Sequence, residues 1–194
     1  KALVADHTKR LEMEWNAREL VDGLGSIRVW LRLSESSLNL RAATSEDARL
    51  IFDWANDPAV RAVSFSSDPI AWENHLTWFT AKLGDANYRI WVAEDKAGTP
   101  VGQVRFQIDG DAATVSISLD AGHRGKNRGS LLIWKACRKL FTASAISHVL
   151  AYIKPDNKAS VRPFEKAGSQ GWDEATVKGA SAWVCRMEQA ETAD

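Results

Sequence analysis

The sequence is poor in the residues that mark several classes of protein. Its 194 residues include only two cysteines, Cys137 and Cys185, which do not have the spacing of a metal site. Lys plus Arg equals Asp plus Glu at 25 each, so no field of one sign favours nucleic acid. We therefore expect two buried thiols, no metal and no nucleic-acid partner.

Long apolar runs are also missing, and we expect no signal peptide in the first residues. No stretch approaches the ~20 apolar residues of a membrane span. The first residues, KALVADHTKR, do not resemble a signal peptide. We expect a cytoplasmic protein with no membrane partner. The chain does not begin with Met, which suggests a fragment of a longer protein.

The composition does supply enough apolar residues, 45%, for one packed domain. Residues 9–21 predict a short helix that ends at a glycine cap near Gly23. The polar stretch at 34–37 predicts a linker. We therefore expect an N-terminal piece at 1–36 and a domain at 37–190.

Hydrophobic periodicity predicts helices and antiparallel strands in the first half of this domain. SLNLRAA predicts a strand, and RIWVAE, VGQVRFQI and TVSISL predict three antiparallel strands. Helical spacing predicts two amphipathic helices, with stripes at Ala48, Ile51, Phe52 and Ala55 and at Trp72, Leu76, Phe79 and Leu83.

The second half predicts a crossover unit. TVSISL, a helix over 129–142 and the strand HVLAYI predict a parallel pair with a right-handed connection. A helix near 157–167 and strands near 172–178 and 181–187 follow. The expected fold is α/β or α+β, with a mixed central sheet of about six to seven strands flanked by helices.

The loop GHRGKNRGS, residues 122–130, joins the strand TVSISL to the next helix. A helix N-terminus presents unpaired N–H groups and a positive dipole end, so such a loop can bind an anion. Gly125 and Gly129 allow close approach, and Lys126 and Arg128 add charge. The residues alone leave open both a pyrophosphate site and an ordinary turn with solvated basic side chains.

Two motifs resemble those of the GCN5-related N-acetyltransferase (GNAT) superfamily. The loop is similar to its acetyl-CoA signature Gln/Arg-x-x-Gly-x-Gly/Ala, with Arg124, Asn127 and Gly129 on the defined positions. KPDNKASVRPFEKAG is similar to its second motif, where Asn157 and Ser160 lie beside the coenzyme. The resemblance covers about residues 38–187. It implies the GNAT fold, acetyl-CoA as donor and direct transfer of the acetyl group to an amine.

The resemblance also implies the coenzyme site. In the family the strand that ends SISLD splays from its neighbour, and backbone groups around Ile117 and Leu119 bind the pantetheine arm and polarise the thioester carbonyl. The implied coenzyme-binding residues are Ile117, Ser118, Leu119, Arg124, Gly125, Lys126, Asn127, Arg128, Gly129, Ser130, Asn157, Ser160 and Phe164.

Four residues depart from the family pattern. Asn127 replaces a glycine, but Asn tolerates the left-handed region best after Gly, so we expect the loop to survive. Phe164 replaces a tyrosine that in many members protonates the departing thiolate; water or Tyr152 could do this, because a thiol has a pKa of ~8.5. Pro163 falls inside the expected helix, and Ser169 loses packing where the family often has Phe. Together with Phe164, these two residues leave open a non-catalytic coenzyme-binding domain.

The acceptor is suggested by a further resemblance. WANDPAVRAVSFSSDPIAWENHLTWFTAKL and VGQVRFQIDGD resemble the UDP-4-amino-sugar N-acetyltransferases of the pseudaminic-acid pathway, and more loosely the ribosomal-protein N-terminal acetyltransferases. Residues 1–33 are similar to the carboxyl end of that pathway's UDP-sugar hydrolase. The expected substrate is an amino sugar nucleotide, with a fused upstream hydrolase domain; a homodimer stays open.

Candidate acceptor residues follow from this resemblance and from strand periodicity. Arg61 and Arg105 could meet a phosphate, and Gln103 shares a strand face with Arg105. The pattern also fits, and slightly favours, a surface loop for Arg61 and a solvated strand face for Arg105. The acceptor set is Arg61, Ser64, His75, Gln103 and Arg105, and the catalytic set is Leu119, Tyr152 and His75 as proton acceptor, with Glu94 and Asp120 as bases through water.

Overall fold

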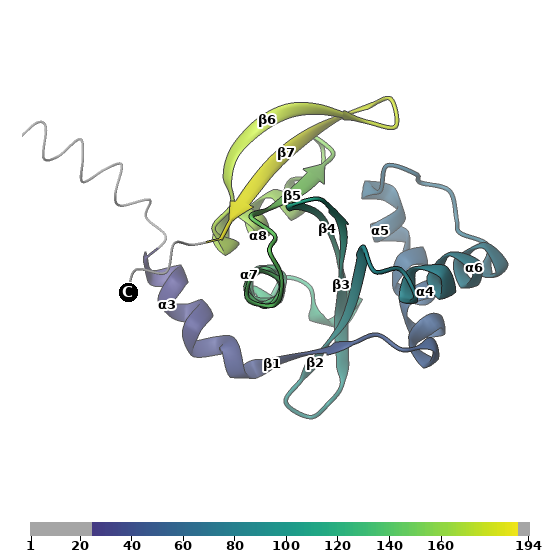
Figure 1. Cartoon of the computed structure of the whole chain (residues 1–194), viewed down its shortest axis with the longest axis horizontal. Coiled ribbons are helices and arrows are strands. Elements are labelled where there is room, and N and C mark those ends of the chain that lie inside the picture. Colours follow the sequence, from purple (N-terminus) through teal and green to yellow (C-terminus); the bar gives the residue numbers. More distant parts are fainter. Residues whose placement is uncertain (1–24, 190–194) are drawn as a thin grey trace, which may run out of the picture.

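A mixed sheet organises the computed structural model, which describes residues 25–189 (Figure 1). Its strand order is β1-β2-β3-β4-β5-β7-β6, and every neighbouring pair is antiparallel except β4 and β5. The seven strands are β1 (Leu38–Ala42), β2 (Tyr88–Asp95), β3 (Pro100–Asp109), β4 (Ala112–Leu119), β5 (His148–Ile153), β6 (Gln170–Val177) and β7 (Ala180–Glu188). The predicted mixed α/β fold is confirmed.

Helices cover both faces of this sheet. In Figure 1, α7, α8 and α3 lie on one side of β2–β4, and α4, α5 and α6 lie on the other. Their bounds are α3 (Gly25–Ser34), α4 (Ala48–Asn56), α5 (Pro58–Val63), α6 (Trp72–Leu83), α7 (Arg128–Ala143) and α8 (Lys158–Ala167), with short 3₁₀ segments at Glu35–Ser37, Ser45–Asp47 and Ala121–His123.

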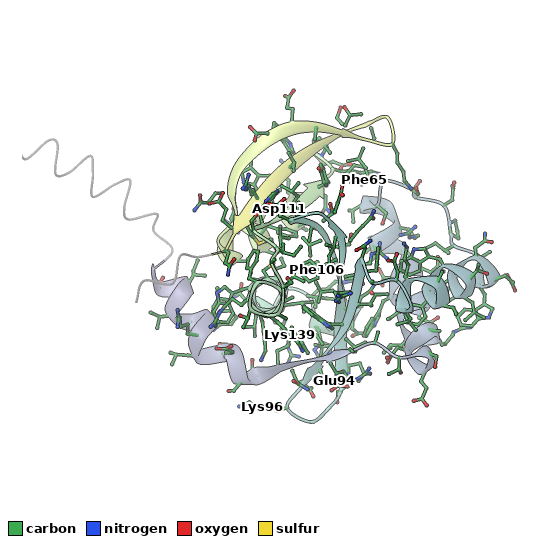
Figure 2. All side chains as sticks on the ribbon, viewed as in Figure 1. Phe65, Glu94, Lys96, Phe106, Asp111 and Lys139 are labelled. Carbon is green, nitrogen blue, oxygen red and sulfur yellow. The ribbon has the colours of Figure 1, made fainter. Side chains whose placement is uncertain are left out.

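Alternation along β2 divides the interior into two cores. Trp91 and Ala93 face the larger core under α7, whereas Ile90 and Val92 pack against α4 and α6. Figure 2 shows Phe106, from β3, in the interior beside α7. The central strands β2 and β3 are therefore buried on both faces, whereas β6 has no buried residue. One row of side chains on β3 and β4 faces the α5–α6 side.

The expected helices differ from the observed ones in three places. The helix expected over 9–21 lies outside the described residues. Two helices, α3 and α5, were not expected. The polar residues next to α3 indicate only a linker, and the Asp57-Pro58 pair at the start of α5 indicates only the end of the preceding helix. In α6 the inward face holds His75 and Phe79, while Leu76 is 40% exposed, so the predicted stripe is rotated by about one position.

The helix α3 packs onto the domain although it precedes the expected boundary near residue 36. Its Leu31 is 1% exposed and belongs to the core under α7.

Cys137 and Cys185 are both free and buried, and burial raises the pKa of the Cys185 thiol to about 11. Across residues 25–189, no helix combines the length and apolar character that a membrane crossing needs.

Candidate active site

A splayed pair of parallel strands opens the site. Pairing between β4 and β5 covers only Ala112–Thr114 on β4, opposite His148–Leu150. Beyond Thr114 the two strands separate, while β4 stays paired with β3 as far as Leu119. The β5-facing backbone groups of residues 115–119 therefore have no strand partner and are available to a ligand.

A cleft of about 1140 Å³ occupies this opening. Figure 2 shows one lining residue, Phe65, between α5 and the β6–β7 hairpin. Of the residues predicted from the sequence, those that line the cleft are Arg61, Ser64, His75, Gln103, Arg105, Ile117, Ser118, Leu119, Arg124, Gly125, Asn127, Gly129, Ser130, Tyr152, Asn157, Ser160 and Phe164. We call the part around 117–130 and α8 the coenzyme half, and the part around Arg61, His75 and Arg105 the acceptor half.

The loop before α7 has the conformation that its sequence requires. Gly125 and Asn127 adopt positive φ angles of 73° and 56°, and α7 begins at the next residue, Arg128. Asn127 thus takes the left-handed conformation in place of a glycine. Its Oδ1 accepts a 2.8 Å hydrogen bond from Lys166 Nζ on α8, which fixes the loop against that helix.

Arg124 ties this loop to both neighbouring parts of the cleft. Its Nε donates to the carbonyl of Leu119 at 3.1 Å, and its Nη1 lies 3.1 Å from Asp57 Oδ1. Asp57 also accepts hydrogen bonds from the backbone N–H groups of Ala59 and Val60, and so caps α5. The Arg124 guanidinium holds the pKa of Asp57 below its usual range.

The residues that flank Asp57, in the stretch from Asn56 to Arg61, position the acceptor half. Asn56 makes two hydrogen bonds, of 2.8 and 3.0 Å, with the backbone of Ile70 and so closes the loop between α5 and α6. Pro58 occupies the first turn of α5, where its missing N–H costs nothing. This short helix carries Arg61 to the cleft wall, so Arg61 does not lie in a surface loop.

A polar row on the sheet forms the floor of the acceptor half. The β3–β4 register places Gln103 opposite Ser118 and Arg105 opposite Ser116, so all four share one face. Gln103 and Ser118 are 4% and 6% exposed. Gln103 Oε1 and Ser118 Oγ are buried and have no hydrogen-bond partner within residues 25–189, which points to a ligand.

Two arginines meet at this floor without a carboxylate. Arg61 donates to Ser66 O at 2.9 Å and to Ser64 Oγ at 3.0 Å, and the Arg105 guanidinium lies 5.1 Å from the centre of the Trp78 ring. Burial and the nearby charge of Arg105 lower the pKa of Arg61. Among the described residues, neither arginine forms an ion pair and no Asp or Glu lines the cleft.

His75 is buried between α6 and α4. Its Nε2 is 3.0 Å from the carbonyl oxygen of Ala48, an atom that only accepts, so Nε2 carries the hydrogen. Burial, and to a smaller extent the charge of Arg105, lower the pKa of His75 below its ordinary 6.5. The imidazole is therefore neutral at pH 7, and Nδ1 keeps a lone pair.

The opposite wall comes from β5 and α8. Tyr152 lines the cleft from β5, and Asn157 Nδ2 donates to Ser160 Oγ at 2.9 Å at the start of α8. Phe164 is only 4% exposed. Pro163 lies inside α8, and its ring would be 3.5 Å from a Cβ added to Gly129, so it packs against the start of α7.

Four candidates do not line the cleft, namely Lys126, Arg128, Glu94 and Asp120. Lys126 Nζ donates to the carbonyl of Gly122 at 2.8 Å. Glu94 is paired with Arg41, and the Asp120 carboxylate accepts from the N–H groups of Gly122 and Trp54. The described cleft residues therefore offer no carboxylate base.

The sequence did not reveal three residues that shape the cleft. Asp57 links the two halves, Lys166 holds Asn127, and Lys178, at the tip of the β6–β7 hairpin, donates to Ser66 Oγ at 3.1 Å. Figure 1 shows this tip reaching towards α5. Only Asp57 had a local signal, since Asp before Pro is typical of a helix start.

The coenzyme half fits the acetyl-CoA that the sequence motifs imply. Arg124 Nη2 is buried without a hydrogen-bond partner in the described chain, so it is a donor available to a ligand. A Cβ on Gly125 would meet nothing within 4 Å, so a ligand can approach the backbone of the loop there. Loop and helix N–H groups can hold a pyrophosphate, and the splayed strand can hold the pantetheine arm.

Comparisons with known proteins agree with this geometry. The chain is 31% identical over 143 residues to the Bacillus subtilis (strain 168) protein named "Putative phosphinothricin acetyltransferase YwnH", over 70% of this chain and 85% of that protein. A structure of AAC(6')-Ib with ribostamycin and coenzyme A matches with a TM-score of 0.72 at 17% identity, over 81% of this chain and 98% of that one.

A third comparison is with spermidine N-acetyltransferase from Vibrio cholerae in complex with CoA and spermine. It matches with a TM-score of 0.66 at 23% identity, over 78% of this chain and 94% of that chain. The family description "Acetyltransferase (GNAT) domain" matches residues 37–170. With the splayed strands and the glycine loop in place, the chain belongs to the GNAT family of acetyl-CoA-dependent acetyltransferases.

Proposed function

We propose that this acetyltransferase acts on the amine of an anionic acceptor, and that the acceptor is a UDP-linked 4-amino sugar. The observation that carries the proposal is the pair Arg61 and Arg105, which face the acceptor half with no carboxylate partner among the described residues. Two uncompensated guanidinium groups favour a phosphate-bearing ligand, since charge-assisted hydrogen bonds to phosphate are strong and often bidentate.

The same charges disfavour polycationic acceptors. The Vibrio cholerae structure contains spermine, and the AAC(6')-Ib structure contains ribostamycin, both of which carry several amino groups. Binding such cations would need carboxylates in the cleft, and none lines it in the described chain. We therefore do not carry these acceptors over to this protein.

The buried atoms without partners fit a sugar nucleotide. Four of the seven such atoms in the described chain belong to residues of the cleft, and Arg61 Nε, Gln103 Oε1 and Ser118 Oγ lie in or next to the acceptor half. They supply both donors and acceptors, which suits a ligand with hydroxyl and phosphate groups. The cleft volume of about 1140 Å³ also exceeds the usual range for one drug-sized ligand, about 300–1000 Å³.

The chain contributes positioning and polarisation to the reaction. Acetyl-CoA supplies the acetyl group as a thioester. Backbone N–H groups of β4 near Leu119, which the splay leaves without strand partners, can donate to the thioester carbonyl and stabilise negative charge there. Tyr152, on the facing strand, is the protein hydroxyl we propose for returning a proton to the thiolate, with water as the second proton source, because Phe164 has no hydroxyl.

His75 is the proton acceptor in this proposal. Because its Nε2 hydrogen is held by Ala48 O, its basic atom is Nδ1. An imidazole with a lowered pKa is a weak base, which is sufficient for a weakly basic amine. An amine with a pKa near 8 is already ~10% neutral at pH 7, whereas a lysine amine is neutral to less than ~0.1%.

A second candidate acceptor is an amino acid of the phosphinothricin type. It is favoured by the name of the relative that is 31% identical, and its phosphinate and carboxylate would also suit the two arginines. A free amino acid would fill less of the acceptor half than a sugar nucleotide would. The sequence resemblances add two further roles, acetylation of a ribosomal-type N-terminal peptide and coenzyme binding without catalysis.

The test is titration of the chain with acetyl-CoA by calorimetry, followed by thiol release with three acceptors in parallel: a UDP-4-amino sugar, phosphinothricin and a ribosomal N-terminal peptide. Thiol release with the sugar nucleotide at the highest kcat/KM supports the proposal. A preference for phosphinothricin or for the peptide overturns it in favour of that class. Coenzyme binding with no release for any acceptor indicates the non-catalytic role.

We also propose that the chain continues upstream into a hydrolase domain of the same cytoplasmic pathway. Residues 1–33 carry that resemblance, and Leu31 on α3 is buried in the acetyltransferase core. An upstream domain that runs into α3 would therefore be joined to this domain by packing as well as by the chain.

A further inference from the structure

A second, smaller pocket lies beside the coenzyme loop and has a volume of about 230 Å³. We call it the Trp30 pocket, and its lining residues are Ser26, Ile27, Trp30, Asn127, Ser130 and Lys166. The last three also line the main cleft, so the two hollows adjoin at the N-terminus of α7. A ligand held by the loop can therefore extend into the Trp30 pocket, on the side of the loop away from the acceptor half.

The outer wall of this pocket comes from α3, which precedes the residues matched by the family description, 37–170. Contacts of α3 with α7 and α8, together with the burial of Leu31, hold the helix in place. Trp30 is 36% exposed and faces the pocket, whereas Leu33, on the same helix, is 78% exposed and lines neither hollow. An indole on an anchored helix is therefore presented beside the loop.

The chemistry of the pocket matches one particular group. Trp30 offers an aromatic face, on which a nucleobase can stack. Lys166 offers an ammonium with three donors, one of which is used by Asn127 Oδ1 at 2.8 Å. Ser26 and Ser130 add hydroxyl groups. An aromatic face, a cation and hydroxyl groups around a small hollow suit an adenine nucleotide.

We propose that the Trp30 pocket binds the adenine nucleotide end of coenzyme A, with the base against Trp30 and a phosphate facing Lys166. The inference rests on the placement of the coenzyme pyrophosphate at the loop and is independent of the identity of the acceptor amine. It makes the N-terminal helix α3 part of the coenzyme site, a role that no motif within residues 37–170 supplies.

The experiment measures coenzyme binding by calorimetry with two probes. The first is coenzyme A, and the second is 4′-phosphopantetheine, which lacks the adenine nucleotide. The substitution Trp30→Ala is expected to weaken coenzyme A binding roughly tenfold, because it removes the aromatic face on which the base stacks. It should leave 4′-phosphopantetheine binding unchanged. Trp30→Phe, which keeps an aromatic face, should recover most of the affinity.

The controls separate this inference from a structural effect. Leu33→Ala, on the same helix but outside both hollows, should bind both probes like the wild type. Equal weakening of both probes by Trp30→Ala would mean that Trp30 only supports the loop, and no change for coenzyme A would mean that the base lies elsewhere; either result overturns the inference. If Gly129→Glu kept full coenzyme A affinity, the loop placement itself would fail, which is a separate result.

Discussion

The coenzyme half of the cleft takes most of its residues from one continuous segment, 117–130, whereas the acceptor half collects Arg61 from α5, His75 from α6 and Arg105 from β3. The arginines of the two halves also differ in their partners. Arg124, in the loop of the coenzyme half, is paired with Asp57, but Arg61 and Arg105 have no such partner in the described chain. The coenzyme half is built largely on a local motif whose loop arginine is paired within the protein, and the acceptor half is a long-range assembly whose two arginines are left for a ligand.

The largest expected effect comes from a substitution that disrupts only the coenzyme half. Gly129 is buried where α7 starts, and a Cβ there would lie 3.5 Å from Pro163 and 3.7 Å from Leu119. Gly129→Glu places a carboxylate against the proposed phosphate site and should lower acetyl-CoA affinity by at least about a hundredfold, since like charges at close range repel strongly. Calorimetry with acetyl-CoA measures this loss.

Gly129→Ala is the matched control. Its methyl group would make only ordinary van der Waals contacts, so the affinity should change by less than about threefold, and Ala also favours the helix. Unchanged affinity in the Glu variant would refute the assignment of the loop to the coenzyme.

The second prediction concerns a substitution that disrupts only the acceptor half. Arg105→Gln removes one of the two unpaired guanidinium groups and should raise the KM of an anionic acceptor about 10- to 100-fold, the range expected when a hydrogen bond to a charged group is lost. The dissociation constant of acetyl-CoA should not change. Steady-state thiol release at saturating acetyl-CoA gives this KM.

Arg89→Gln, at an exposed position of β2 outside the cleft, is the control and should behave like the wild type. A lower KM in the Arg105 variant would contradict the proposal, because it would show that the acceptor is a cation repelled by Arg105.

The contrast between the halves also explains what the sequence could reveal. The strand, loop and helix of the coenzyme half are adjacent in the chain, so periodicity and glycine spacing identified them, including the left-handed residue Asn127. The bond between Lys166 and Asn127 joins residues 39 positions apart and has no local signal. Likewise, a rotation of α6 by one residue decides whether His75 or Leu76 faces inward, and periodicity does not resolve so small a rotation.

The third prediction tests how the two halves are joined. Asp57→Asn keeps a good helix cap, because Asn caps as well as Asp, but removes the charge opposite Arg124. A partly buried ion pair of this kind is worth about 1 kcal/mol. Both the dissociation constant of acetyl-CoA and the KM of the acceptor should therefore rise about three- to tenfold.

The control for Asp57 is Asp53→Asn, which removes an exposed carboxylate paired with Arg49 on the surface of α4 and should change neither value. An effect of Asp57→Asn on the coenzyme alone would show that the bridge serves only the loop and does not couple the two halves.

The smallest expected effect concerns pH and His75. Because burial lowers the folded-state pKa of His75 below its unfolded value of about 6.5, the unfolded chain binds the proton more readily. The free energy of unfolding should therefore fall as the pH drops from 7 through 6.5 to the lowered pKa. His75→Gln cannot titrate but can still donate to Ala48 O, so it should remove this part of the pH dependence. Denaturant titrations at pH 7 and pH 5.5 measure it. The titration of Asp57 does not overlap this pH range, because its lowered pKa moves its own titration to lower pH.

If Nδ1 of His75 is also the proton acceptor, the same variant should lower kcat several-fold at pH 7 and flatten the acidic limb of kcat/KM. A flattened stability profile with unchanged kcat would leave His75 as a packing residue of the acceptor half and remove it from the chemistry.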